Sequence, residues 1–405
     1  MSQTVSQSVP WPSERPVSAD HYLRSRIRSL DLDNIAELAT RAGSLEDVIA
    51  LWYGEGDVVT PAFIRHAATE ALESGKTFYV PDMRGYAPLN EALSAYQTQV
   101  HGKPIPIERS TVTPGGMQAF LLAMEMVCDA GDNIVYLTPQ WPNIPSAIHL
   151  VGGEPRPVPL VADEADLTLD LDRLFDACDA RTRAIVLSTP SNPSGWTASR
   201  AELQALLEFG RARGIWIVSD EVYNRLWFED GPAAPSMRDI CEDDDRVLTI
   251  NTFSKAWAMT GWRIGWLGHP VSVAPHVAAM TQYMNSGTAA FVQAGATAAL
   301  REGEPFVAEM RERCRDGRDA AFAELEAAGS ILLPRKPRGG MYVFFRIDGQ
   351  EDGNLACRRI LEEARVGLAP GRLFGDSSHA FLRMCVCRDT EQIAEASRRI
   401  ARAIA

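Results

Sequence analysis

Several features of common protein classes are missing from this 405-residue chain. No stretch of eighteen consecutive apolar residues occurs, so we expect no membrane-spanning helix. The opening segment MSQTVSQSVPWPSERP has neither a basic nor an apolar part, which argues against a secretory signal and predicts a disordered arm. Lys and Arg form no long runs and the net charge is −13, which argues against nucleic acid or membrane as a partner.

The seven cysteines lack the C-x-x-C spacing of zinc or disulfide-exchange sites. An odd, unpatterned set of cysteines indicates reduced thiols, and we therefore expect a cytoplasmic protein. Cys385 and Cys387 lie two positions apart in a predicted strand, whose alternate side chains point to opposite faces. We interpret both as structural residues and predict no metal site.

The length and the 46% hydrophobic content allow more than one domain. Apolar runs at 133–137, 184–188, 215–219 and 247–250 alternate with helical patterns and are too continuous to face water, which predicts a mostly parallel α/β sheet. We predict a three-layer α/β/α large domain over 61–300 and a smaller α+β domain over 301–405. Residues 1–60 would form an N-terminal arm and a segment that joins the small domain.

The stretch TINTFSKAWAMTGWRIGWLG, residues 249–268, contains a lysine in an unusual setting. Lys255 follows an apolar run, with Thr252 and Ser254 just before it and Arg263 eight positions after it. An amine beside hydroxyls and a guanidinium suits a cofactor that has an aldehyde and a phosphate, such as pyridoxal 5′-phosphate (PLP). Burial and positive neighbours lower the pKa of a lysine toward the neutral amine that Schiff-base chemistry requires.

Two further features place polar groups near this lysine. Gly115-Gly116-Met117 opens a helical run, and the exposed backbone N–H groups of a helix start favour an anion. Asn192, Asp220 and Lys255 each come shortly after a predicted strand. Because ligands of parallel sheets bind beyond the carboxyl ends of the strands, we expect these side chains at one edge.

Three motifs resemble those of one family. S-K-A-W-A-M-T-G-W-R at 254–263 resembles the lysine signature of the class I and II aminotransferases, in the fold-type-I superfamily of PLP enzymes. N-P-S-G at 192–195 resembles that family's N-P-T-G turn, and D-E-V-Y at 220–223 resembles its D-E-x-Y motif. The resemblance extends from about Gly54 to Arg388.

The resemblance implies PLP as the cofactor and assigns roles around it. Lys255 would form the Schiff base, Asp220 would pair with the pyridine nitrogen, and Tyr223 would act beside them, so these three are the catalytic candidates. Asn192 and Tyr223 would donate to the phenolic oxygen, and Trp141 would stack on the ring. The phosphate would be held by the following residues: Gly115, Gly116, Met117, Thr252, Ser254, Arg263 and, from the other subunit of a homodimer with shared active sites, Tyr79.

The resemblance also implies how the amino acid and 2-oxo acid substrates bind. Gly54 would approach the substrate through its backbone, with Asn192 nearby, and Arg383 would clamp the α-carboxylate. Arg372 and Arg388 compete for that last role, but the F-L-R spacing favours Arg383.

The predicted activity is transfer of an amino group from an L-α-amino acid to a 2-oxo acid through a Lys255 Schiff base. A PLP-dependent β-lyase or cyclising synthase would share nearly every residue named. A non-catalytic PLP-binding regulatory module is a further alternative, but the first 50 residues are too short for its DNA-binding domain. Met117 stands where some dicarboxylate-specific relatives have lysine, which weakens an aspartate or glutamate assignment; with Trp52 and Tyr53 it favours an apolar or aromatic amino acid.

Overall fold

The computed structural model describes residues 18–30, 35–162, 166–333 and 335–404. The chain divides into two compact units, residues 1–32 and 33–405. The first unit contains a 3₁₀ turn, η1 (Ala19–Tyr22), and a short helix, α1 (Ser25–Arg28). The predicted disordered arm lies outside the described residues, and the predicted division at residues 60 and 300 stays a prediction.

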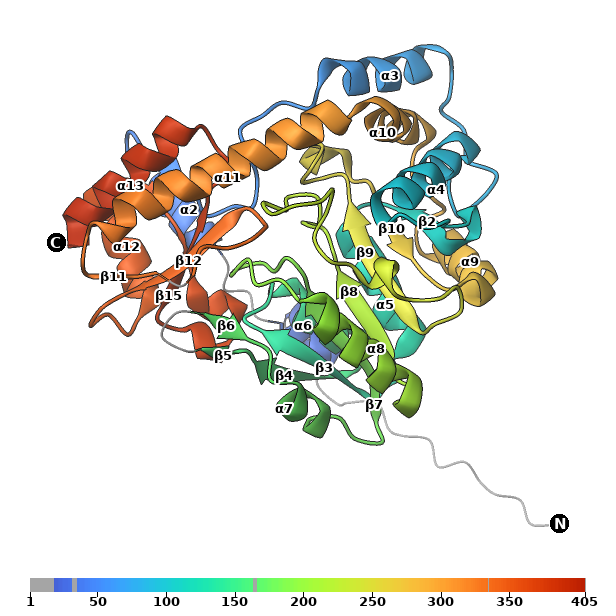
Figure 1. Ribbon diagram of the computed structural model, residues 1–405, viewed down its shortest axis with the longest axis horizontal. Helices are drawn as coiled ribbons and strands as arrows, with labels where there is room; N and C mark the ends of the chain where they lie inside the picture. The colour runs from blue at the N-terminus through green and yellow to red at the C-terminus, as the bar shows by residue number, and fades with distance from the viewer. Residues whose placement is uncertain (1–17, 31–34, 163–165, 334, 405) are drawn as a thin grey trace. The chain divides into compact units, whose positions relative to one another are not determined.

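A seven-stranded sheet forms the centre of the second unit (Figure 1). Its strands, in spatial order, are β2 (Ser110–Thr113), β10 (Gly265–Gly268), β9 (Val247–Thr252), β8 (Trp216–Asp220), β7 (Thr182–Ser188), β3 (Asn133–Thr138) and β4 (Glu154–Pro159). All neighbouring strands from β4 to β9 pair in parallel, and only β10 runs antiparallel to both of its neighbours. The predicted mostly parallel sheet is therefore confirmed.

Side-chain alternation along the strands creates the layers. Ile134 and Val186 point to one face, where they pack against α5 (Gly116–Val127), α6 (Asn143–Val151) and α9 (Ala274–Met284). Their neighbours Val135 and Ile185 point to the other face, against α7 (Leu171–Asp176) and α8 (Arg200–Arg213). Because both faces are covered, the strands read as continuous apolar runs, and the three-layer arrangement is confirmed.

A further group of helices supports the segment around Lys255. It consists of α3 (Ala62–Glu73), α4 (Ala87–His101) and α10 (Ala290–Glu302), beside β2 and β10 (Figure 1). Phe253 and Trp257, on either side of Lys255, are buried in the apolar cluster that these helices form. The Trp257 indole N–H also donates to the Ala299 carbonyl at 3.0 Å, so the turn that carries Lys255 is anchored on both sides.

The C-terminal part is a smaller α+β arrangement. An antiparallel sheet contains, in spatial order, β11 (Ile331–Leu332), β12 (Tyr342–Ile347), β15 (Phe381–Cys385) and β14 (Ala369–Pro370). Its helices are α11 (Glu304–Glu326), α12 (Gly353–Ala364) and α13 (Thr390–Ile404), and α11 runs from α10 to this sheet (Figure 1). Further elements are α2 (Ala36–Ala42), β1 (Ile49–Ala50), which pairs with β13 (Val366–Gly367), and the hairpin of β5 (Val161–Ala162) and β6 (Leu167–Thr168).

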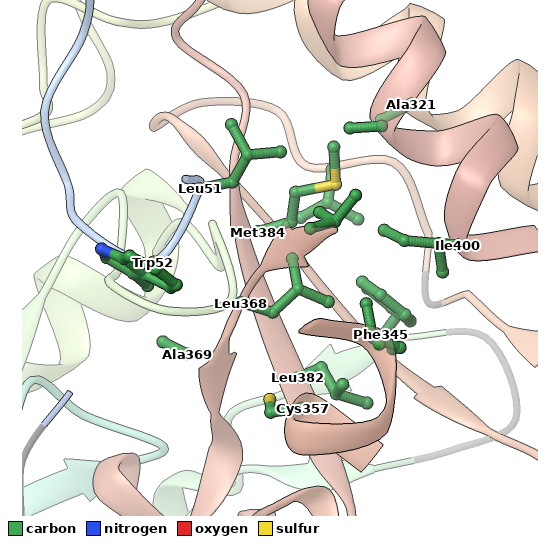
Figure 2. Packing of buried hydrophobic residues seen from close by; sticks show 14 of the residues in the cluster. Leu51, Trp52, Ala321, Phe345, Cys357, Leu368, Ala369, Leu382, Met384 and Ile400 are labelled. Carbon is green, nitrogen blue, oxygen red and sulfur yellow. The ribbon is translucent and has the colours of Figure 1, made fainter. Parts of the chain in front are cut away.

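The core of this C-terminal part includes residues from the beginning of the second unit. Figure 2 shows Leu51 beside Met384, and Trp52 beside Ala369. The Trp52 ring occupies space that opens only because Gly367 has no side chain, since a Cβ there would overlap the ring. Trp52 is therefore a core residue, and the expectation that its side chain favours one class of substrate is wrong.

The cysteines and helices of the described part add two observations. All seven cysteines are free thiols, and Cys385 and Cys387 are buried with Cys314 in one apolar cluster. Within the described ranges, no helix combines the length and the apolar character that crossing a membrane requires.

Candidate active site

A cavity of about 320 Å³ opens beside the carboxyl ends of β7, β8 and β9. It is lined by every predicted site residue except Gly115 and Tyr79: Gly54, Gly116, Met117, Trp141, Asn192, Asp220, Tyr223, Thr252, Ser254, Lys255, Arg263 and Arg383. The volume falls in the range typical of small-molecule sites.

Strand register explains why distant residues meet here. Ser188, Asp220 and Ile250 are aligned across β7, β8 and β9, so these three strands end at the same edge. The Thr189 N–H donates to the Asp220 carbonyl at 2.9 Å and carries the chain past this edge toward Asn192. The predicted convergence of Asn192, Asp220 and Lys255 is thus observed.

Lys255 presents its amine to the cavity. Its Nζ donates to the Gly54 carbonyl at 2.7 Å and lies 5.7 Å from the centre of the Tyr223 ring. Burial lowers the pKa of Lys255 below the usual value for lysine, and the Arg383 guanidinium lowers it further. No carboxylate in the described part of the chain forms an ion pair with this amine, so deprotonation disrupts no salt bridge.

Asp220 is buried with weak hydrogen bonds to the protein. Its carboxylate accepts from the Ser188 hydroxyl at 3.4 Å and from the Val222 N–H at 3.3 Å, both long for such bonds. Burial raises the pKa of Asp220 to about 7. A positively charged N–H placed in the cavity would stabilise the ionised form of this carboxylate.

Tyr223 meets a second tyrosine that the sequence did not single out. The hydroxyls of Tyr223 and Tyr342 are 2.8 Å apart, and the two rings meet edge to face at 5.6 Å. Burial raises the pKa of Tyr342 to about 12 and that of Tyr223 well above its usual value, so both keep their protons. Gly54 packs against this pair, because a Cβ there would overlap the Tyr342 hydroxyl.

Arg383 extends from β15 into the cavity with one hydrogen-bonding atom unused. Its Nη1 donates to Asn192 Oδ1 at 2.8 Å, and its Nη2 donates to the Trp52 carbonyl. Its Nε is buried and has no partner among the described residues. The guanidinium lies between the rings of Tyr342 (4.5 Å) and Phe374 (4.8 Å).

The competing arginines are placed elsewhere. Neither Arg372 nor Arg388 lines the cavity, and the Arg372 Nε donates to Asn354 Oδ1 at 3.0 Å. A guanidinium is well suited to bidentate carboxylate binding, and Arg383 is the one that faces the cavity from the C-terminal part. The preference for Arg383 over these two agrees with the geometry.

One end of the cavity has the features of an anion site. Helix α5 begins at Gly116, so the N–H groups of its first turn lack partners within the helix. Gly115 has a φ of 88°, and a Cβ there would lie 2.5 Å from Arg263 Nη2. Glycine suits this position, because it tolerates the positive φ and leaves room for the Arg263 guanidinium. No carboxylate in the described ranges pairs with Arg263, whose Nη1 donates to the Thr260 carbonyl at 2.8 Å.

The hydroxyls before Lys255 complete this end. The Thr252 hydroxyl lies 2.9 Å from the Ser254 hydroxyl and 3.0 Å from the Ile264 carbonyl. The Ser254 N–H donates back to Thr252 Oγ1 at 3.2 Å. Thr252 therefore orients Ser254 as well as lining the cavity.

Trp141 lines the cavity from the turn between β3 and α6. The turn is tied to the C-terminal part, because the Gln140 N–H donates to the Phe374 carbonyl at 2.8 Å. Met117, in the first turn of α5, lies with its sulfur 3.7 Å from the Asn143 amide nitrogen.

Tyr79 lies outside the cavity of its own chain. Its side chain is 84% exposed, and the neighbouring Phe78 is 83% exposed. Tyr79 is therefore not a core residue of its own chain, and its predicted role in a second subunit stays a prediction.

Several lining residues carried no recognisable signal in the sequence. Tyr342, Ile35, Leu373 and Phe374 all face the cavity. They belong to no motif, and apolar or aromatic side chains look the same in a sequence whether they line a site or fill a core. Only tertiary structure reveals them.

The set of groups fits PLP. The N–H groups at the start of α5, the Ser254 hydroxyl and the Arg263 guanidinium suit a phosphate. The Lys255 amine suits an aldehyde. The buried Asp220 carboxylate suits a pyridine N–H. A layered α/β structure with a lysine at the carboxyl edge of its sheet, a buried carboxylate and an anion site beside it is the arrangement expected of a PLP-dependent enzyme.

Comparisons with known proteins agree with this class. The family model for aminotransferase class I and II matches residues 46–400. An aspartate aminotransferase of Pyrococcus horikoshii is 30% identical over 95% of this chain and 97% of its own length. An arginine–pyruvate transaminase of Pseudomonas aeruginosa is 32% identical over 88% and 90%. The solved aspartate aminotransferase of Thermotoga maritima superposes with a TM-score of 0.87 at 30% identity, over 94% and 99%.

The chain belongs to the class I and II aminotransferase family. It is an aminotransferase, an enzyme that moves amino groups between amino acids and 2-oxo acids, and its family uses PLP. The relatives named above are all aminotransferases, which does not favour the lyase, synthase or regulatory alternatives.

Proposed function

We propose that this aminotransferase binds PLP covalently through Lys255 and uses the cavity residues to pass an amino group from an L-α-amino acid to a 2-oxo acid. The observation that carries the proposal is the Lys255 amine, whose pKa burial lowers, in the same cavity as Asp220 and the unused Nε of Arg383. When bound, PLP supplies an aldehyde that links to amines and an aromatic ring that accepts electrons.

The phosphate would be held at the start of α5. The backbone N–H groups of Gly116 and Met117, the Ser254 hydroxyl and the Arg263 guanidinium are the donors available there. Gly115 gives Arg263 room to approach, and Thr252 orients Ser254. A helix start and a guanidinium together favour a doubly charged anion.

The aromatic part would lie beside the strand ends. Asp220 would accept the pyridine N–H and keep it protonated, and the Trp141 indole would supply apolar contact to the ring. Arg383 engages Asn192 Oδ1, so the Asn192 amide N–H groups stay available to donate to the phenolic oxygen. The Tyr223 hydroxyl, protonated because burial raises its pKa, is the second donor.

The substrate would bind between Arg383 and Lys255. Arg383 holds the α-carboxylate and uses its unpaired Nε, while the backbone at Gly54 contacts the substrate on the other side. Lys255 Nζ, once free and neutral, takes the proton from the substrate α-carbon and returns it as a general acid. A lysine with a lowered pKa suits both directions of this transfer.

We also propose a homodimer with shared active sites. Phe78, Tyr79 and Tyr283 are each more than 80% exposed, which is unusual for aromatic side chains. The segments that carry them are adjacent, because a Cβ at Gly287 would lie 3.8 Å from the Met83 sulfur. Burial against a second copy would cover these rings and bring Tyr79 to that copy's phosphate site.

Seven free thiols support a reducing compartment such as the cytoplasm.

The test is a half-reaction followed by absorbance. Purified enzyme carrying PLP is mixed with single L-amino acids in the absence of a 2-oxo acid, and the absorption band of the lysine-linked cofactor is recorded. We expect stoichiometric loss of this band with one amino acid, release of the matching 2-oxo acid, and recovery of the band when a 2-oxo acid is added.

Two other results would contradict the proposal. Persistence of the band while ammonia and a 2-oxo acid accumulate would identify a lyase. Absence of any such band in enzyme given excess PLP would overturn the assignment of Lys255 as the attachment site.

A further inference from the structure

The ionisable groups of the cavity are few, and the proposed chemistry uses all of them. Among the described lining residues, the only Asp, Glu, Lys, Arg or His side chains are those of Asp220, Lys255, Arg263 and Arg383. Under the proposed function these bind the ring nitrogen, the aldehyde, the phosphate and the α-carboxylate. Three tyrosines also line the cavity, at 53, 223 and 342. Tyr223 and Tyr342 keep their protons, because burial raises the pKa of each.

The remaining wall of the cavity is apolar. It includes Ile35, Tyr53, Met117, Leu373 and Phe374, which come from four segments of the chain. This wall adjoins the groups that would bind the substrate, because Phe374 lies 4.8 Å from the Arg383 guanidinium and Tyr53 precedes Gly54, whose carbonyl binds Lys255. With the carboxylate on Arg383 and the α-carbon facing Lys255, the substrate side chain would lie along this wall.

Polar groups near this wall are engaged elsewhere. Arg372 immediately precedes Leu373, yet its Nε donates to Asn354 Oδ1 at 3.0 Å, and its side chain lines a different cavity together with Glu37 and Asp352. The Thr260 hydroxyl donates to the Glu55 carboxylate. A charged substrate side chain would therefore find no counter-ion within the described part of this wall.

We infer that this aminotransferase prefers amino donors with a neutral, apolar side chain, aliphatic or aromatic, over donors with an acidic or basic one. The inference rests on the proposed function and adds the substrate class to it. An apolar side chain gains by leaving water for this wall, whereas an unpaired carboxylate or guanidinium loses its hydration without compensation. Apolar pockets discriminate by about 10–200-fold for small changes in a ligand, and we expect about 100-fold against a charge.

The first experiment compares donors in the absorbance half-reaction. Enzyme carrying PLP is mixed with L-phenylalanine, L-methionine, L-leucine, L-aspartate, L-glutamate or L-arginine, and the second-order rate of band loss is measured for each. We expect the three apolar donors to react about 100-fold faster than the three charged donors. Fastest reaction with aspartate, glutamate or arginine would overturn the substrate class but leave the aminotransferase proposal intact. Failure of every donor would overturn the proposed function as well.

The second experiment places a charge in the wall. Met117→Lys replaces one unbranched side chain with another of similar length, and the new amine offers a partner to an acidic substrate. We expect the ratio of the aspartate rate to the phenylalanine rate to rise about tenfold or more. Leu373→Arg, on a different segment of the wall, should change the ratio in the same direction.

The matched control is Leu355→Lys, which adds the same charge at a side chain that is 56% exposed on α12. It should leave the ratio unchanged. Retention of the cofactor band and of the urea midpoint in each variant shows that folding is intact. A ratio that stays unchanged in both wall variants, with folding intact, would show that the substrate side chain does not contact this wall.

Discussion

Two consecutive carboxylates, Asp220 and Glu221, occupy opposite kinds of surroundings. Both are buried, with 5% and 1% exposure, and burial raises the pKa of each. Asp220 has two long hydrogen bonds and faces the cavity. Glu221 accepts a short bond from the Ser236 hydroxyl at 2.5 Å and one of ordinary length from the Met237 N–H at 3.0 Å.

The surroundings of Glu221 continue as a buried polar cluster. The Arg109 carbonyl accepts from Arg238 Nη2 at 2.8 Å and from the backbone N–H of His269 at 3.0 Å. Burial lowers the pKa of His269 to about 4, so this imidazole is neutral, and its nitrogens contact the Thr111 hydroxyl and the Pro270 carbonyl at 2.9 Å each. The comparison teaches that burial alone does not identify a functional acid. The informative feature is a buried acid whose hydrogen bonds the protein leaves weak.

The largest effect should come from removing the amine of the cavity. Lys255→Ala is expected to abolish the cofactor band and to slow amino-group transfer by at least about 10³-fold, because the general base is lost. Lys103→Ala is the matched control, since Lys103 Nζ also donates to a carbonyl, that of Cys241, at 2.6 Å, but away from the cavity. Transfer that survives in the Lys255 variant, measured as 2-oxo acid formed per folded enzyme, would refute the assignment.

Asp220→Asn should give the next largest loss. The amide cannot hold a pyridine N–H in its protonated form, and removing one electrostatic stabiliser costs about 10²–10³-fold in turnover. Folding should not suffer, because a poorly bonded buried acid contributes little to stability. Turnover and urea unfolding of the same preparation test both parts, and unchanged turnover would contradict the proposed pairing.

The pH dependence of stability tests the titration of Asp220, whose carboxylate the protein leaves with only weak hydrogen bonds. An aspartate has a pKa of about 3.9 when unfolded, and burial raises the pKa of Asp220 to about 7 in the folded protein. Between these values the folded state binds more protons, so the free energy of unfolding should fall as the pH rises from 4 to 7. The loss should approach about 4 kcal/mol in cofactor-free enzyme, at about 1.4 kcal/mol per pKa unit.

Asp220→Asn should remove this part of the pH dependence. Urea unfolding at pH 5 and pH 8 for both proteins measures the difference. An equal slope in the two proteins would show that Asp220 does not titrate in this range.

The parts of the fold and site that could be predicted lie in contiguous segments. Residues 252–263, 189–195 and 220–223 directly follow strands, and the apolar runs of those strands are readable in the sequence. Position in the chain then determines which edge of the sheet each motif reaches. Arg383 was also predictable, because a single arginine follows the F-L pair in a clear strand pattern.

Other parts depend on contacts between segments that are far apart. The hydroxyls of Tyr223 and Tyr342 meet across 119 positions, and nothing local in G-G-M-Y indicates this contact. Trp52 was expected to favour an apolar or aromatic substrate, yet its ring fills the space above Gly367. The space left by Gly367, which is far away in the sequence, accommodates the Trp52 ring.

Tyr342→Phe tests the hydrogen bond between the Tyr342 and Tyr223 hydroxyls, and its effect should be smaller than that of Asp220→Asn. It removes the hydroxyl that lies 2.8 Å from the Tyr223 hydroxyl and keeps the ring against Arg383. One hydrogen bond is worth about 0.5–1.5 kcal/mol, so turnover should fall by about tenfold or less. If Tyr223 donates to the cofactor, the pH at which the cofactor band changes should rise by about half a unit. An unchanged spectral titration would show that Tyr342 does not act through Tyr223.

The smallest effect on catalysis should come from Glu221→Gln, next to Asp220 in the sequence. The amide keeps one acceptor for Ser236 or Met237 but places an N–H group where an acceptor was needed, so the unfolding free energy should fall by about 1–3 kcal/mol. Turnover per folded enzyme should stay within about threefold of the unmodified enzyme, because Glu221 does not line the cavity. Urea unfolding and active-site-normalised turnover separate the two effects. A large catalytic loss without destabilisation would mean that the polar cluster belongs to the site, and the contrast between the two carboxylates would no longer hold.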